Sequence, residues 1–271
     1  MEFSKRVAVI TGGASGIGRA VAAALAQRSV AAVALVDMNE AVNEVADKLN
    51  QDAGRLVAIP FCGDTTNESF RSSVYDAISR DYGLVTLCVP AAGITRDEIA
   101  VRIDKNTGKA RIYPIEKFKL VVDVNLIAPV YWALEMIGRI AEDRAARGVK
   151  RWTPDEHMQG SVVFIGSISS QGNRGQISYA STKAGLEGAA ATIMKEAMFH
   201  GVRCSVIHPG FTDTPMVRAL GMDYVAKNIL PYTQLGRLIA PEEIADAICF
   251  MLGNSAVSGE LWVDAGWHAP A

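Results

Sequence analysis

A glycine-rich segment near the N-terminus constrains the fold of this chain most strongly. Segment 11–18 follows a short apolar run at 6–10 and precedes a helix-like stretch. Its glycines, Gly12, Gly16 and Gly18, allow a tight turn and the close approach of a phosphate to the backbone. Because the start of a helix favours negative charge, this arrangement predicts a site for the pyrophosphate of a dinucleotide.

The remainder of the chain alternates apolar strand-like runs with helix-like segments. Further strands are expected at 31–36, 56–61, 84–89, 161–165, 202–207 and 260–263, with helices at 40–50, 67–81, 117–147, 179–199 and 241–251. Continuous apolar strands between helices are typical of a parallel sheet buried on both faces. The sequence therefore predicts one α/β domain over 1–271, a Rossmann-type doubly wound parallel sheet of about seven strands with helices on both faces.

Composition narrows the class of protein. The chain has 271 residues, is 49% hydrophobic and carries a formal net charge of −2, which suits a buried core and gives no reason to expect nucleic acid or a membrane as partner. No signal peptide is expected at the N-terminus. The four cysteines are scattered and form no C-x-x-C pair, which suits a reducing, cytoplasmic setting. The histidines show no ligand spacing, so no metal site is expected, and His208 is interpreted as structural or cofactor-adjacent.

Asp37 ends the second predicted strand, about twenty residues after the glycine loop. A carboxylate there can accept hydrogen bonds from ribose hydroxyls, and it repels a 2′-phosphate. Neither Met38 nor Ser15 offers a positive charge. The sequence therefore favours NAD over NADP. The alternative is that Asp37 only caps the next helix, but Asn39 could serve as that cap.

Tyr179 and Lys183 lie four residues apart, so on a helix they share one face. A tyrosine has a pKa of about 10, and a nearby cation lowers it toward the range useful for proton transfer. Ser167, twelve residues earlier, could hydrogen-bond a substrate oxygen and hold it against the phenol. The alternative is a surface tyrosine and lysine on an amphipathic helix. Together with the glycine loop, the three residues predict a proton exchange with an alcohol or a carbonyl.

Two segments interrupt the alternation of strands and helices. Segment 102–112 is expected to form a small hairpin that turns at 106–108, where a glycine follows Asn106 and Thr107. Segment 139–159 is charged and contains Pro154. It is interpreted as a solvated helix end and loop, with a partner or substrate contact as the alternative.

With these motifs, the chain resembles the classical short-chain dehydrogenase/reductase family over nearly its whole length, from Val7 to about Gly266. The matching motifs include Thr11-Gly12-x-x-x-Gly16-x-Gly18, Asp64, Asn125, Ser167, Tyr179-x-x-x-Lys183, Pro209-Gly210-x-x-x-Thr214 and the closing segment 258–266. The combination is highly specific to that family.

The resemblance implies four catalytic residues. Tyr179 would be the general acid in reduction and the base in oxidation, and Ser167 would orient the substrate oxygen. Lys183 would bond the nicotinamide ribose and lower the pKa of the tyrosine. Asn125 would sit in mid-helix and hold a water that links Lys183 to solvent. Because the interval from Ser167 to Tyr179 is one residue shorter than is common in the family, Ser169 is a reserve candidate for the serine role.

The resemblance also implies a set of cofactor contacts. Asp64 would bond the adenine amino group with Thr65 beside it, and segment 209–214 would cover the nicotinamide. The implied cofactor-binding residues are Gly12, Ser15, Gly16, Ile17, Gly18, Asp37, Met38, Asp64, Thr65, Ala91, Ala92, Gly93, Tyr179, Lys183, Pro209, Gly210, Thr212 and Thr214. Where the family usually has Asn-Ala-Gly, this chain has Ala91-Ala92-Gly93. We expect a local stability cost there and no loss of activity.

The sequence does not specify a single substrate. Segments 93–97, 173–176 and 209–214 are similar to those of 3-oxoacyl-thioester reductases, and the NAD preference and the hairpin are similar to 3-hydroxyacyl-CoA dehydrogenases. A steroid- or polyol-type alcohol dehydrogenase, a non-catalytic NAD-binding protein and a nucleotide-sugar epimerase or dehydratase are the alternatives. Segment 212–235, with its apolar stripe, is expected to be a substrate-side lid, or else core packing.

The expected partners are a small-molecule alcohol or ketone and further copies of this chain. By the resemblance, the helix after Tyr179 and the helix over 117–147 form the interface of a homotetramer, or of a dimer. The small residues of the first of these helices, from Ala184 to Ala190, permit close helix approach, although they could simply pack on the sheet.

Overall fold

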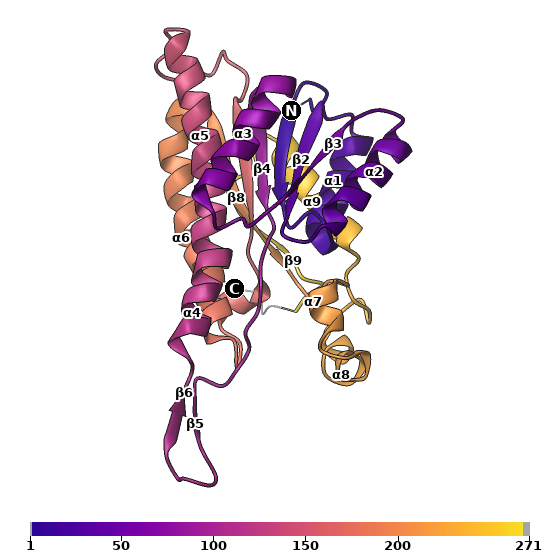
Figure 1. Cartoon of the computed structure of the whole chain (residues 1–271), viewed down its shortest axis with the longest axis vertical. Helices are drawn as coiled ribbons and strands as arrows, with labels where there is room; N and C mark the ends of the chain where they lie inside the picture. Colours follow the sequence, from indigo (N-terminus) through magenta and orange to yellow (C-terminus); the bar gives the residue numbers. More distant parts are fainter. Residues whose placement is uncertain (1, 268–271) are drawn as a thin grey trace.

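The computed structural model describes residues 2–267, in which seven strands form one parallel sheet (Figure 1). The strands are β1 (Val7–Thr11), β2 (Ala32–Asp37), β3 (Ala58–Cys62), β4 (Val85–Pro90), β7 (Gly160–Ile165), β8 (Val202–Pro209) and β9 (Gly259–Val263). Their order is β3-β2-β1-β4-β7-β8-β9, and every neighbouring pair is parallel. The predicted Rossmann-type doubly wound sheet is confirmed.

Helices cover both faces of this sheet, because alternate side chains of each apolar strand point to opposite sides. Val9 belongs to the core beneath α3 (Glu68–Tyr82), α5 (Ala128–Ala146) and α6 (Ile177–Ala197). Ile10, the next residue, belongs to the core beneath α1 (Gly16–Gln27), α2 (Ala41–Ala53) and α9 (Pro241–Gly253). Each face therefore has its own hydrophobic core, and the sheet between them is rigid enough to position a site at its end.

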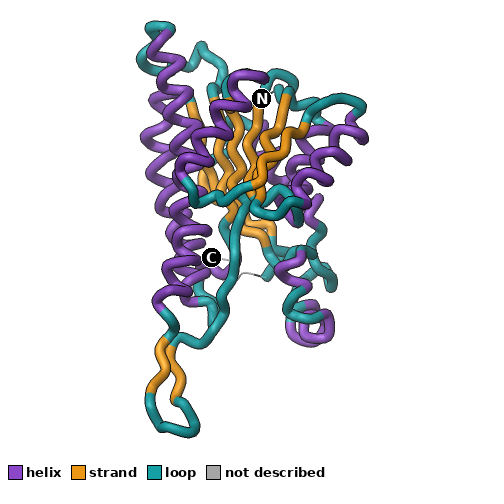
Figure 2. Tube along the Cα trace, in the orientation of Figure 1, coloured by secondary structure: helices purple, strands orange, loops and turns teal. Residues whose placement is uncertain are grey.

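The strand order reverses between β1 and β4, which are neighbours in the sheet. From β1 the chain proceeds to β2 and β3 on one side, and from β4 it proceeds to β7, β8 and β9 on the other. The loops that leave β1 and β4 therefore diverge at the carboxyl edge of the sheet. Figure 2 shows the strands side by side, with helices flanking them and loops at their ends. Ligands of doubly wound sheets bind in the crevice that such a reversal opens.

The predicted long helix is interrupted near its beginning. It starts with α4 (Ile115–Val122), passes through a π-helical turn (Asp123–Ile127) and continues as α5. The π turn carries one residue too many for a regular helix, a feature often found at functional sites. Hydrophobic periodicity does not reveal such a turn, so the sequence predicted a continuous helix.

The stretch Ile115–Ala146 is also long enough for a membrane span, and an 18-residue window within it has a mean hydropathy of 1.6. By those criteria alone a core helix passes equally well. Trp132, Met136 and Ile140 from this stretch are buried in the core against the sheet.

The predicted hairpin is confirmed. Strands β5 (Val101–Ile103) and β6 (Ala110–Ile112) pair antiparallel and project from the body below α4 (Figure 1). The Asp104 carboxylate accepts the backbone N–H groups of Asn106 and Thr107 at 2.9 Å each, which closes the turn.

The charged segment 139–159 is only partly a solvated helix end. Helix α5 ends at Ala146, but Arg144 is buried and donates two hydrogen bonds to the Glu156 carboxylate, at 2.6 and 3.1 Å. This pair ties the loop before β7 back to the helix. Two short 3₁₀ turns, Ile168–Gln171 and Met198–His200, complete this half of the chain.

The expected lid, segment 212–235, folds into α7 (Pro215–Arg218), α8 (Met222–Asn228) and a 3₁₀ turn (Leu230–Tyr232). Val225 and Ile229 are buried, which is core packing, whereas Met216 and Leu220 remain exposed at the carboxyl edge of the sheet. Part of the segment is therefore core packing, and its role as a substrate-side lid stays a prediction.

Candidate active site

The glycine loop has the conformation that its composition predicts. Gly12 has φ +71°, and a Cβ atom there would lie 2.8 Å from the backbone nitrogen of Ala92. A Cβ atom on Gly18 would overlap the carbonyl oxygen of Gly12. Only glycine fits at these two positions, so the loop packs backbone against backbone beside the start of α1.

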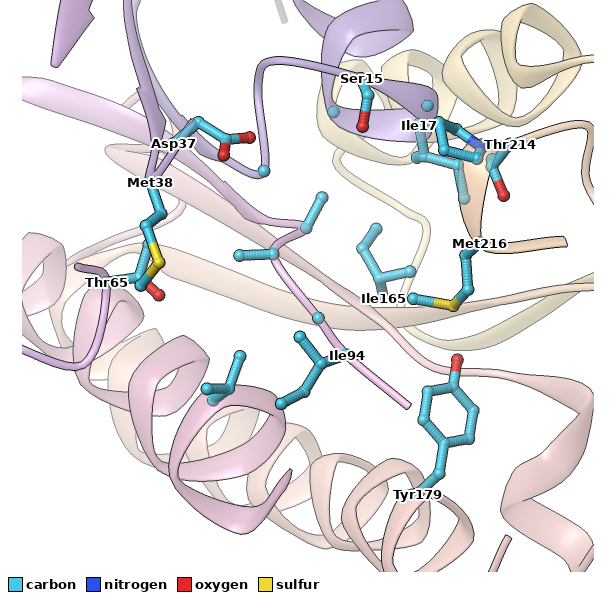
Figure 3. Close-up of a pocket in the computed structure, with 18 of the residues that line it drawn as sticks. Ser15, Ile17, Asp37, Met38, Thr65, Ile94, Ile165, Tyr179, Thr214 and Met216 are labelled. Carbon is cyan, nitrogen blue, oxygen red and sulfur yellow. The ribbon is translucent and has the colours of Figure 1, made fainter. Parts of the chain in front are cut away.

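A cavity of about 410 Å³ lies at this point of the sheet edge (Figure 3). Of the predicted cofactor residues, Gly12, Ser15, Gly16, Ile17, Gly18, Asp37, Met38, Asp64, Thr65, Ala91, Ala92, Gly93, Tyr179, Lys183 and Thr214 line it. The structure adds residues that the sequence did not single out for this cavity, namely Ile94, Val124, Ile165, Pro215 and Met216. Ser15 and Asp37 lie at one end and Tyr179 at the other, with the phenol pointing toward Met216.

The Asp37 carboxylate is held by backbone groups on both sides. One oxygen accepts the Ala14 N–H at 3.0 Å, and the other accepts the Asn39 N–H at 2.9 Å. The Asn39 side chain in turn accepts the Ala41 N–H at 3.0 Å, so it caps the start of α2 as expected. Asp37 is therefore free of that task, and its charge stands where the glycine loop meets β2.

A second cavity, of about 140 Å³, adjoins the first. The two share Ile17, Ile165, Tyr179, Thr214 and Met216 in their linings. Four further predicted residues line only the smaller cavity: Ser167, Pro209, Gly210 and Thr212. Tyr179 and Thr214 thus stand at the junction of the two spaces.

Tyr179 is half-buried, and desolvation of its phenol raises its pKa to about 12. A hydrogen bond with the Ser167 hydroxyl acts in the opposite direction, and the negative charge of Asp97 raises the pKa further. Ser167, and not Ser169, therefore contacts the phenol. The Ser169 hydroxyl instead donates to the side-chain oxygen of Gln176 at 2.8 Å.

Lys183 is buried on the same helix face. Its ammonium donates to the carbonyl oxygen of Ile165 at 2.7 Å and lies 5.4 Å from the centre of the Tyr179 ring. Burial lowers the pKa of Lys183 to about 8. Desolvation dominates the pKa of Tyr179, and Lys183 is not among the groups that shift it. The lowering of the tyrosine pKa by this lysine stays a prediction.

Asn125 lies in the π turn and is fully buried. Its side-chain oxygen accepts the Ile94 N–H at 2.9 Å, and its amide nitrogen donates to the Ile94 carbonyl at 2.8 Å. It lines neither cavity. The amide fastens the segment that follows β4, behind Gly93. The expected contact of Asn125 with a water stays a prediction.

The family of the chain follows from comparison with known proteins. The model of the short chain dehydrogenase family matches residues 6–224. The chain belongs to this family. Curated relatives include the 3-oxoacyl-(acyl-carrier-protein) reductase of Escherichia coli (strain K12), 30% identical over 99% of both chains. Another is the cis-4-hydroxycyclohexanecarboxylate dehydrogenase of Sinomonas cyclohexanicum, 31% identical over 98% of both.

Solved structures share the fold. A short-chain type dehydrogenase/reductase from Mycobacterium marinum superposes with a TM-score of 0.83 at 24% identity, covering 99% of this chain and 98% of the other. The family assignment makes this chain a short-chain dehydrogenase with a Rossmann-type fold.

The sequence did not predict Asp97 as a site residue of this short-chain dehydrogenase. The Asp97 carboxylate accepts a hydrogen bond from the Gln176 side chain at 2.8 Å, and both residues line the smaller cavity. Asn173 also donates to Gln176, at 3.0 Å. Asp97 and Gln176 lie far apart in the sequence, so no local pattern could have paired them.

The Ala91-Ala92 departure from the family pattern lies where β4 meets β1. The Ala91 N–H donates to the Thr11 carbonyl and the Ala92 N–H to the Thr11 hydroxyl, both at 3.1 Å. The two backbone N–H groups at this edge therefore have hydrogen-bond acceptors on Thr11, although the usual asparagine side chain is absent. The expected stability cost stays a prediction.

Proposed function

We propose that this chain transfers a hydride between the nicotinamide of NAD and a secondary alcohol or ketone. The observation that carries the proposal is the position of Tyr179 at the junction of the two cavities. The larger cavity has the glycine loop of a dinucleotide site, and the smaller one has the serine that contacts the phenol. A proton donor shared by both spaces can serve a reaction between their two occupants.

The residues of the larger cavity fit a dinucleotide. The backbone at Gly12 and Gly18 leaves no room for a side chain, and helix α1 directs its N-terminus into the same space. This combination binds pyrophosphate in other doubly wound folds. When bound, the nicotinamide ring supplies or takes up the hydride. The residues of the chain hold the cofactor and the substrate, and they move the proton.

The carboxylate of Asp37 supports NAD over NADP. A 2′-phosphate placed beside it would meet a like charge, whereas ribose hydroxyls can donate to its remaining lone pairs. Among the described residues that line the cavity, Lys183 alone is a cation, and it is hydrogen-bonded to Ile165. Met38, beside Asp37, is two-thirds exposed and uncharged.

In the proposed mechanism Tyr179 gives its proton to the carbonyl oxygen in reduction and takes it from the hydroxyl in oxidation. Ser167 holds that oxygen by a hydrogen bond. Lys183 binds the nicotinamide ribose, and Asn125 keeps the segment after β4 in place by its two bonds to Ile94. Pro209, Gly210, Thr212 and Thr214, which line the smaller cavity, would cover the nicotinamide, as the family resemblance implies.

The substrate we propose is a 3-oxoacyl or 3-hydroxyacyl thioester. The smaller cavity has an apolar side made of Phe211, Met216, Val217 and Leu220, and a relative with full-length coverage is a 3-oxoacyl-(acyl-carrier-protein) reductase. A second candidate is a small cyclic secondary alcohol, which the similarity to a hydroxycyclohexanecarboxylate dehydrogenase favours. A non-catalytic NAD-binding role is less well supported, because the serine, the tyrosine and the lysine are all present.

The test is the oxidation of NADH, followed by its near-ultraviolet absorbance, with acetoacetyl-CoA as substrate. NADPH is the cofactor control, and Tyr179→Phe is the control for chemistry. We expect turnover with NADH that falls by about 10²-fold or more in the variant, while NADH still binds. Full activity in Tyr179→Phe would overturn the mechanism. Turnover only with a cyclic ketone would keep the mechanism and select the second substrate class.

We also propose that the protein is a cytoplasmic homotetramer or dimer. The π turn exposes Ile127 and helix α5 exposes Tyr131 and Leu134, and a Cβ atom on Gly188 of α6 would meet nothing within 4 Å. These features leave an apolar, closely approachable surface on the pair of helices. Gly185, by contrast, packs against Leu126 of the π turn within the chain.

A further inference from the structure

A buried histidine outside the proposed hydride-transfer chemistry faces two carboxylates. His208 of β8 is fully buried, and its Nε2 atom lies 3.2 Å from an oxygen of Glu260 and 3.8 Å from an oxygen of Glu187. The nitrogen and the two oxygens all lie within 4.8 Å of one another. The three residues come from β8, β9 and α6, so the fold brings them together although the sequence gives no ligand spacing.

The Nε2 atom has no hydrogen-bond partner of acceptable geometry among residues 2–267, although a carboxylate oxygen is within reach. A hydrogen bond would require that oxygen to lie along the N–H direction. A cation bound between the three side chains does not require this alignment, because each ligand atom then points at the ion and not at the other ligand atoms. An unsatisfied nitrogen in a buried position is costly unless something binds it.

We propose that Glu187, His208 and Glu260 bind a divalent metal ion, with Zn²⁺ as the preferred metal. Bonds of about 2.0–2.2 Å to nitrogen and carboxylate oxygen in a tetrahedral site place neighbouring ligand atoms about 3.3 Å apart. The observed 3.2 and 3.8 Å bracket that separation. Imidazole as a ligand favours zinc over magnesium and calcium, which prefer oxygen alone.

The surroundings of His208 suit a metal ligand. Its ring stacks on Trp262 with centroids 4.1 Å apart, which fixes the ring plane. Its other nitrogen, Nδ1, lies 3.2 Å from the carbonyl oxygen of Ser167. The Ser167 backbone N–H also approaches Nδ1, at 3.3 Å, so the role of this nitrogen depends on the tautomer of the ring. In the tautomer that carries its proton on Nδ1, that proton is donated to the Ser167 carbonyl, and the lone pair of Nε2 is free for the ion. Metal-binding histidines commonly make such a bond with a backbone carbonyl.

The charge of the cluster and its access to solvent also suit a divalent metal ion. The two carboxylates give the site a charge of −2, which a divalent ion neutralises. The Glu187 side chain is 29% exposed and that of Glu260 is 42% exposed, so an ion can enter from solvent and a water can take a fourth position. Binding of an ion by these three side chains does not depend on the proposed reaction.

The test is the titration of Zn²⁺ into full-length protein freed of metal by a chelator, read by competition with a chromogenic chelator. We expect one tight ion per chain. Glu187→Gln and Glu260→Gln should each weaken it by roughly a hundredfold or more, because even the loss of an outer partner of a ligand costs 10–100-fold. Both substitutions keep the side-chain size and lie at exposed or half-exposed positions, so the fold should persist. Circular dichroism checks this.

Glu196→Gln on the same helix, at an exposed position away from His208, is the matched control and should bind zinc as the natural chain does. Co²⁺ in place of Zn²⁺ should give the visible absorption of a tetrahedral site in the natural chain, and Glu187→Gln and Glu260→Gln should each lose it. No zinc binding, or binding of equal strength in all four proteins, would overturn the proposal. The second result would place the ion elsewhere, for example at the exposed thiol of Cys62.

Discussion

The ammonium group of Lys183 donates a hydrogen bond to the carbonyl oxygen of Ile165 at 2.7 Å, inside the protein and at the carboxyl end of β7. A buried cation with one backbone acceptor is poorly compensated, and this is why burial lowers its pKa. The position is nevertheless suited to catalysis, because it places the cation in the wall of the larger cavity within reach of a bound cofactor.

This burial predicts a pH dependence of stability. The pKa of Lys183 is about 8 in the folded protein, against an ordinary value of 10.5. Below about pH 8 both states carry the proton, and the cost of burying the charge is fully present. Between about pH 8 and 10.5 the unfolded chain binds more protons, so the contribution of Lys183 to stability rises with pH.

We therefore expect the stability of the natural chain, relative to Lys183→Met, to rise by about 2 kcal/mol between about pH 7 and 9.5. Urea unfolding of both proteins at the two pH values measures this. Other titrating groups, including Tyr179, are present in both proteins, so their contributions cancel when the two free energies of unfolding are subtracted. Parallel changes in the two proteins would show that Lys183 is not buried as a titrating group.

The carboxylate of Asp37 predicts how cofactor preference can be changed. Asp37→Ser together with Met38→Arg removes the negative charge and places a cation where a 2′-phosphate would lie. Hydrogen bonds to charged groups contribute about 1.5–3 kcal/mol each, so kcat/KM with NADPH relative to NADH should rise by roughly 10–100-fold. Met38→Arg alone is the control and should change the ratio less, because Asp37 remains. An unchanged ratio in the double variant would contradict the role given to Asp37.

Two glycines on different helices test the geometry of the loop. A Cβ atom on Gly18 would overlap the Gly12 carbonyl, so Gly18→Ala should displace the loop and weaken NADH binding by at least about tenfold. Gly138 lies within α5, where an added Cβ would meet nothing within 4 Å. Gly138→Ala should leave NADH binding unchanged and stabilise the fold by about 0.5–1 kcal/mol. Fluorescence titration and urea unfolding give the two quantities, and equal NADH affinity in both variants would refute the steric argument.

Local patterns predicted most of the fold. The apolar runs, the glycine loop and Asp37 each specify a local conformation, and the sheet followed from their order along the chain. Helix α6 begins at Ile177, two residues before the predicted start, because the backbone turn at its beginning depends on loop geometry. The hairpin was predictable since Asn106, Thr107 and Gly108 form a turn by themselves.

Features that depend on contacts across the fold could not be predicted. The π turn exists where Asn125 meets Ile94, and nothing in the local periodicity marks it. The pKa of Tyr179 lies above its ordinary value because the phenol is desolvated in the fold. The spacing along the helix indicates only that Lys183 lies near Tyr179. The cluster around His208 draws on three separate elements.

Asp97 gives the last prediction, which rests on the proposed role of Tyr179. Its negative charge raises the pKa of the phenol, and its carboxylate accepts a hydrogen bond from Gln176. Asp97→Asn keeps an acceptor for Gln176 and removes the charge. The pKa of Tyr179 should fall, and the rising limb of kcat/KM for alcohol oxidation, in which the phenolate is the base, should move to lower pH.

Glu98→Gln is the matched control, because that neighbouring carboxylate is paired with Lys117 at 2.8 Å and is not among the groups that shift the pKa of the phenol. A limb that moves equally in both variants, or toward higher pH in Asp97→Asn, would show that Asp97 does not act on the phenol through its charge.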